Sequence, residues 1–65
     1  MNRVGQMWVH NHDLYLCVGS HEEAPGVWMH IFVDLGANDT HTFEESERIR
    51  WNDSDLSLYW KRLDG

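Results

Sequence analysis

Apolar residues alternate along three segments of this chain, and the alternation gives each segment two different faces. The clearest case is VWMHIFVDL at 27–35, where odd positions are aliphatic and even positions are aromatic, histidine or aspartate. Segments 6–10 and 14–18 show the same alternation. Because side chains point to opposite faces of a strand with a period of two, we predict a sheet with an aliphatic face and an aromatic, histidine-rich face.

The first two strands, about 6–10 and 14–19, are expected to form a hairpin. Asn11-His12 would be a two-residue type I′ turn, whose positive φ angles Asn and, less often, His tolerate. The register that follows pairs chemically suitable residues across the strands. The expected pairs are Trp8 with Tyr15, Val9 with Leu14, and His10 with Asp13.

Polar turns separate the next strands. Residues 20–26 contain Pro25-Gly26 and predict a loop before a third strand at 27–35. Residues 36–39 are turn material, and a fourth strand follows at about 40–43. We expect this strand to pair so that Phe43 lies opposite Phe32 and His41 opposite Asp34, since a one-residue slip would reverse its faces.

The C-terminal third has helical signals. Thr42 and Glu45 fit a capping box that would start a helical turn at 43–47, and 48–51 fits a fifth short strand. Residues 52–55, NDSD, are a helix-start signal. A single helical stripe follows, formed by Leu56, Tyr59, Trp60 and Leu63. Alternation at 56–60 also fits a strand, and we favour a short helix over about 55–63.

The segments VGQMWV (4–9), LYLCVGS (14–20), VWMHIFVDL (27–35) and THTFEESERIRW (40–51) together resemble the SH3-like small barrels. More narrowly, they are similar to small acidic proteins of uncharacterised function that bacteriophages and prophages encode. The resemblance covers residues 4–51. We therefore expect a mainly β protein, either an SH3-like small barrel or a four- to five-stranded antiparallel meander with a short C-terminal helix. The Pro-Tyr pair of SH3 peptide grooves is missing, so proline-rich ligands are not implied.

Chain length bounds the architecture. With 65 residues we expect one domain, 1–65, which buries only about 60% of its unfolded surface and is marginally stable without help. Cys17 is the only cysteine, so a disulfide within the chain is excluded, and metal or oligomerisation stay open as aids. The lone cysteine and the lack of a signal peptide or membrane span favour the cytoplasm, that of the host for a phage-encoded protein.

The net charge of −6 argues against direct nucleic-acid binding, which usually requires a basic surface. It suits a basic protein partner or mimicry of a phosphate backbone, and it also suits solubility alone.

Residues with catalytic or metal-binding chemistry do not form a recognised pattern. The five histidines lack metal-ligand spacing, although His10, His30 and His41 would share one face. The letters HNH at 10–12 lack the extended ββα site of the nuclease. We interpret Cys17 as buried or at an interface, and the carboxylates as loop and capping charges. We therefore predict no enzyme, no cofactor and no metal site.

The aromatic face is then the main candidate site. Its expected members are Trp8, His10, Tyr15, Trp28, His30, Phe32, His41 and Phe43. An exposed apolar face of this size is typical of an interaction surface. Three alternatives stay open: the C-terminal stripe covers the face, the chain self-associates through it as in a homodimer, or it binds another protein. The expected function is non-enzymatic binding to a host protein, with a homo-oligomeric subunit or a sponge for a nucleotide-like ligand as alternatives.

Overall fold

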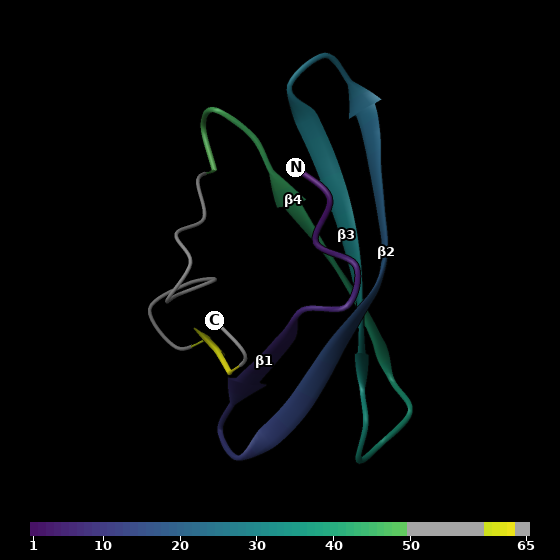
Figure 1. The fold of residues 1–65 in the computed structure, drawn as a ribbon, viewed down its shortest axis with the longest axis vertical. Coiled ribbons are helices and arrows are strands. Elements are labelled where there is room, and N and C mark those ends of the chain that lie inside the picture. Colours follow the sequence, from purple (N-terminus) through teal and green to yellow (C-terminus); the bar gives the residue numbers. More distant parts are fainter. Residues whose placement is uncertain (50–59, 64–65) are drawn as a thin grey trace.

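The computed structural model describes residues 1–49 and 60–63, and its strands form one antiparallel sheet (Figure 1). The strands are β1 (Met7–His10), β2 (Asp13–Ala24), β3 (Val27–Asp34), β4 (Thr40–Glu45) and β5 (Lys61–Arg62). Their order in the sheet is β4-β3-β2-β1-β5. The mainly β class and the antiparallel meander are confirmed. The sheet is open between β4 and β5, so the SH3-like barrel is not confirmed.

The first hairpin forms as predicted. Trp8 pairs with Tyr15, Val9 with Leu14, and His10 with Asp13. Asn11 and His12 have φ angles of 49° and 69°, as a type I′ turn requires. This part of the fold depends on neighbouring residues alone, which is why the sequence specifies it well.

Strand β2 is longer than expected, because Ser20–Ala24 continue it and only Pro25-Gly26 turns the chain. The prediction of a loop over 20–26 is therefore wrong at all but its last two positions. Strand β1 ends beside the first half of β2, so the second half of β2 pairs with β3 alone. Its polar composition reflects exposure at an edge, where polar side chains are tolerated.

The pairing of β3 with β4 differs from the expected register by two residues. Phe32 lies opposite His41, and His30 lies opposite Phe43. A shift of two keeps every side chain on its expected face, because strand side chains alternate with that period. The intervening turn sets the register: Asp34 Oδ1 accepts the backbone N–H of Gly36 at 2.9 Å, and the Asp34 N–H donates to the Asp39 carbonyl at 2.8 Å.

The helical predictions are wrong where the structure describes them. Residues 43–45 belong to β4, so Thr42 caps no helix, and Glu45 is used for a long-range ion pair instead. Arg48 and Ile49 are in no strand. Lys61 and Arg62 form β5 beside β1, so the expected helix does not extend over its last residues. The rest of that helix, 55–59, and the end of the expected fifth strand, 50–51, lie outside the described residues.

The core lies on the aromatic face of the sheet. Its buried apolar members are Trp8, Tyr15, Cys17, Phe32 and Trp60. The N-terminal segment, residues 1–6, runs from β1 towards β4 (Figure 1) and is held to β2 by the Gly5 N–H, which donates to the Cys17 carbonyl at 2.9 Å. Trp60 and this segment supply the second layer that a sheet needs in order to bury one face.

Candidate interaction face

All eight residues predicted to form a binding surface share the aromatic face, as the cross-strand pairs show. Their exposure differs from the prediction. Trp8, Tyr15, His30 and Phe32 are buried, His10, Trp28 and Phe43 are half-buried, and His41 is exposed. Trp8, His30 and Phe32 each have a relative exposure of 0%. The expectation of an exposed aromatic surface is therefore corrected: in the single chain most of this face is interior.

Trp60 packs over the aromatic face from the C-terminal side of the chain. Its ring centroid lies 4.2 Å from that of Tyr15 and 5.0 Å from that of Phe43. It also stacks on His10 at 5.1 Å with nearly parallel rings. Because Trp60 precedes β5 and Phe43 lies on β4, this contact joins the two edges of the open sheet. For this residue the alternative of a cover from the C-terminal stripe is the one that the structure supports.

A chain of polar groups crosses the same interior beside the aromatic rings. The Arg3 guanidinium binds Glu45 at two points, Nε to Oε1 at 2.9 Å and Nη2 to Oε2 at 2.8 Å. His30 Nε2 lies 2.8 Å from Glu45 Oε1, and His30 Nδ1 lies 2.6 Å from Ser20 Oγ. Because an ionised carboxylate only accepts hydrogen bonds, His30 donates from Nε2, and its neutral form accepts the Ser20 hydroxyl at Nδ1.

The electrostatics favour a neutral His30 beside an ionised Glu45. Burial lowers the pKa of His30 below its ordinary value of 6.5, and the charge of Arg3 acts in the same direction against the opposing effect of Glu45. Burial alone would raise the pKa of Glu45, but the hydrogen bonds from Arg3 and His30 outweigh it and lower that pKa. The group therefore holds one cation and one anion, which balance each other in the interior.

Ser20, His30 and Glu45 are the residue types of a serine hydrolase triad, so we tested that interpretation against the geometry. A triad needs a nucleophile that substrate can reach and a base that is free to take its proton. Here the Ser20 oxygen accepts the Arg3 backbone N–H at 3.0 Å, and His30 has no exposed surface. The hollow of about 420 Å³ between Pro25 and Arg48 has neither residue in its lining. The network is a structural link between the N-terminal segment and β4.

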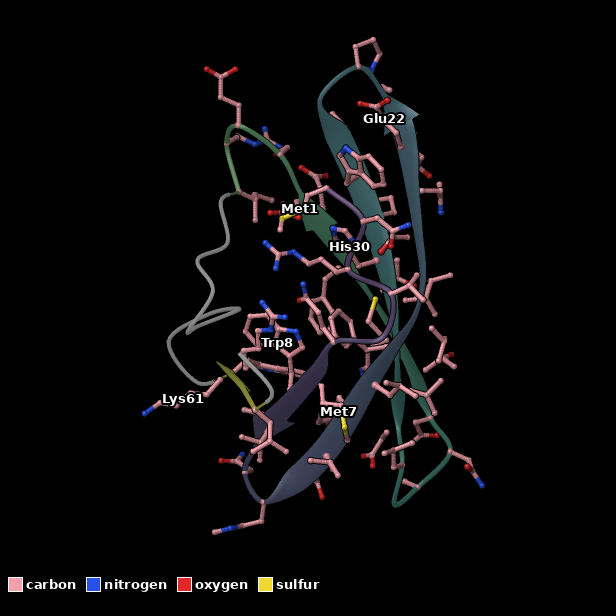
Figure 2. The ribbon with its side chains drawn as sticks, in the orientation of Figure 1. Met1, Met7, Trp8, Glu22, His30 and Lys61 are labelled. Atoms are coloured by element: carbon pink, nitrogen blue, oxygen red, sulfur yellow. The ribbon has the colours of Figure 1, made fainter. Side chains whose placement is uncertain are left out.

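The opposite, aliphatic face of the sheet has no layer over it among the described residues. We define it by cross-strand pairs as Met7, Val9, Leu14, Leu16, Val27, Met29, Ile31, Val33, Thr40 and Thr42. The apolar members are all half-buried, and the two threonines are exposed. Figure 2 shows the side chains of Met7 and Trp8, neighbours on β1, leaving the strand in different directions. Across residues 1–49 and 60–63 no Val, Leu, Ile, Met or Ala is buried.

This distribution is unusual because Ile, Val and Leu are among the residues most often found fully buried. The core described above contains aromatic rings and one thiol instead. Gly19 shares the aliphatic face with its partner Ile31, and a Cβ there would meet the Ile31 side chain at 3.3 Å. The aliphatic face is thus a continuous apolar surface, half-buried and with no layer packed over it by the residues that the structure describes.

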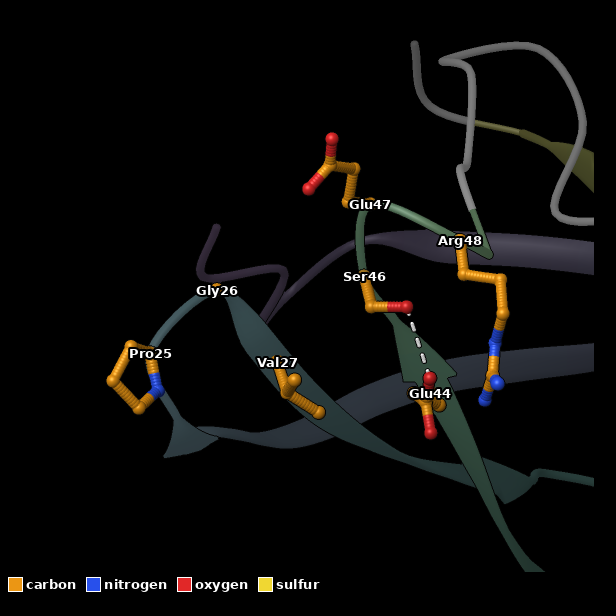
Figure 3. A pocket seen from close by; sticks show the side chains of 7 residues that line it. All are labelled: Pro25, Gly26, Val27, Glu44, Ser46, Glu47 and Arg48. Atoms are coloured by element: carbon orange, nitrogen blue, oxygen red, sulfur yellow. Dashed lines mark hydrogen bonds between the residues drawn. The ribbon is translucent and has the colours of Figure 1, made fainter.

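A shallow hollow adjoins one corner of this face (Figure 3). Val27 and Glu44 line it together with Pro25, Gly26, Ser46, Glu47 and Arg48. The Ser46 hydroxyl donates to Glu44 Oε2 at 2.9 Å, so part of its polar lining is already paired. In the described part of the chain no three His, Cys, Asp or Glu side chains are arranged to hold a metal ion.

Comparison of the chain with known proteins found no match among protein families, curated proteins or solved structures. Among the described residues there is no helix with the length and hydropathy to cross a membrane.

Two structural features could not be predicted from the sequence pattern. The buried position of Arg3 has no local signal, because its partner Glu45 lies 42 positions away. The exposure of the aliphatic face was missed because both faces are apolar enough to form a core. The alternation itself showed that the chain has more apolar faces than one small domain needs to bury. It did not show that the aromatic face is the buried one.

Proposed function

We propose that this chain is a non-enzymatic binding protein that acts by protein–protein contact through its aliphatic face. The observation that supports the proposal is that all described aliphatic side chains are at least partly exposed, and that those of three central strands form one surface. An apolar surface of this extent on a small domain marks an interaction site.

The aromatic face has a supporting part in this function. Its rings and the network of Arg3, Glu45 and His30 form the interior that holds the sheet in shape. Of the eight residues predicted for binding, His41 is the exposed one, and it lies at the end of β4 rather than within a shared surface. The binding role therefore belongs to the residues that alternate with the predicted set.

Site-specific photo-crosslinking tests this function. A photo-reactive amino acid replaces Val33, at the centre of the aliphatic face, or Asn38, in the exposed turn after β3. We expect protein adducts from position 33 and none, or far fewer, from position 38 after irradiation in cells. Equal adduct yields from both positions, or no adduct from position 33, would overturn the proposal.

A further inference from the structure

We infer that the partner of the aliphatic face is a second copy of this chain, and that two sheets pack face to face as a sandwich. The inference rests on the proposed function, because it names the partner of the same face. Three observations support it: the composition of the core, the distribution of charge over the face, and the size of the face.

The core of the single chain is small and contains no aliphatic side chain among the described residues. A chain of 65 residues is only marginally stable by itself, and oligomerisation is one of the common remedies. Two sheets stacked about 10 Å apart would interdigitate their inner side chains. Leu16, Ile31 and Val33 of both copies would then form a second, aliphatic core. Homodimer interfaces have this character, since they are more apolar than contacts between independent proteins.

Charge on the aliphatic face is confined to its margins. Glu44 pairs with Met29 at the β4 edge, and Lys61 pairs with Val9 at the β5 edge. His21 pairs with Met29 from the other side, on the half of β2 that lies beyond β1 and is itself an edge. The centre of the face is uncharged, so the net charge of −6 is carried elsewhere and does not select a basic partner at this surface. Because a two-fold contact brings the same surface of each copy together, one acidic and one basic margin can complement each other across it.

The size of the face is close to what a stable dimer needs. For a flat sheet, four strand spacings of about 4.8 Å and eight residues of β3 at about 3.3 Å each give roughly 500 Å² in projection. This area is an upper bound, because the contact of Trp60 with Phe43 curves the sheet around the aromatic core. Two copies would bury at most about 1,000 Å², which lies at the lower end of specific interfaces. The contact is therefore expected to be reversible and to depend on concentration.

Light scattering behind size exclusion, across a wide concentration series of the purified chain, measures this directly. We expect twice the single-chain mass of 7.7 kDa at high concentration. Val33→Lys places two like charges in the contact and is expected to raise the dissociation constant on the order of a hundredfold. Val4→Lys is the matched control, because Val4 is 54% exposed on the N-terminal segment, and it should leave the dimer intact.

Unfolding of the wild type gives a second measurement that needs no variant to fold. The midpoint of thermal unfolding should rise with protein concentration, since dimerisation stabilises the folded chain by mass action. A wild type with the single-chain mass and a constant midpoint at all concentrations would overturn the inference. A dimer that survives Val33→Lys would also overturn it, because the contact would then lie elsewhere.

The crosslinking experiment separates failure of this inference from failure of the proposed function. Adducts that join position 33 to a second copy of this chain support both the second-copy inference and the proposed function. Adducts only with a different protein, together with a monomeric purified chain, overturn the second-copy inference and leave the proposed function standing. An adduct within one chain, between position 33 and residues 50–59, overturns both, since the chain would then cover its own face.

Discussion

Arg3 and Glu45, 42 positions apart in the sequence, form a two-point ion pair in the interior of the protein, with nitrogen–oxygen distances of 2.9 and 2.8 Å. Arg3 is 2% exposed, and the carboxylate of Glu45 also accepts a hydrogen bond from His30. This pair ties the N-terminal segment to the edge strand β4 across the aromatic face. It decides, together with Trp60, which side of the sheet becomes the core.

Removal of Arg3 should destabilise the fold strongly. Arg3→Ala leaves the Glu45 carboxylate without its cation in the interior, and breaking a buried pair in this way costs about 3–5 kcal/mol. Urea unfolding followed by tryptophan fluorescence measures the loss. Arg48→Ala is the control, because Arg48 is exposed, and such surface changes stay within about 0.5 kcal/mol. Equal losses from the two variants would show that the buried pair carries no special share of the stability.

The stability of the fold should decrease as the pH falls from 7 towards 5. Burial holds the pKa of His30 in the folded protein below 6.5, its ordinary value. At a pH between the folded and the unfolded pKa, the unfolded chain therefore binds more protons than the folded one. His30 therefore does not reduce the free energy of unfolding above pH 6.5, and it reduces it progressively as the pH falls below 6.5. A further loss begins below about pH 4.5, where the lowered pKa of Glu45 contributes in the same direction.

Urea midpoints across this pH range, for the wild type and for His30→Gln, test the assignment. Glutamine retains hydrogen-bonding capacity and does not titrate, so the variant should lose part of the slope between pH 7 and pH 5. At higher pH the two proteins should differ by a constant amount. An unchanged slope in His30→Gln would assign the acid sensitivity to other groups.

The sequence specified the parts of this fold that depend on neighbouring residues. The Asn11-His12 turn and the register of Trp8 with Tyr15 follow from a loop of two residues and from alternation, and both are confirmed. The β3–β4 register was missed by two positions because it depends on how the Asp34 side chain folds the following turn. A shift of two residues keeps each side chain on the same face, so the residues predicted to share a face do share it.

Which of the two faces forms the core could not be decided from the pattern. Both faces carry enough apolar area, and the outcome depends on Arg3 and Trp60, which approach the sheet from opposite ends of the chain. Thr42 and Glu45 have the spacing of a capping box, yet Glu45 serves Arg3 and His30 instead. Local signals of this kind lose to long-range contacts when a buried charge needs a partner.

Truncation of Trp60 should expose the core and release the C-terminal strand. Trp60 is 8% exposed and contacts Tyr15 and Phe43, so Trp60→Ala removes a buried ring at a cost of about 3–5 kcal/mol. Trp28→Ala is the matched control, because Trp28 is half-buried and should cost clearly less. Thermal unfolding by circular dichroism compares the two, and a larger loss from Trp28→Ala would mean that Trp60 does not close the aromatic face.

The turn of the first hairpin offers a substitution that should stabilise the protein. His12 has a φ of 69°, a left-handed conformation that costs energy for every residue with a side chain and none for glycine. His12→Gly would create the Asn-Gly sequence that type I′ turns prefer, and we expect a gain of about 0.5–1 kcal/mol. The same substitution in an extended strand should act in the opposite direction, so His21→Gly, at an exposed position of β2, should lose about 0.5–1 kcal/mol. Urea unfolding at pH 8 measures both variants, and effects of the same sign would show that the backbone at position 12 does not determine the outcome.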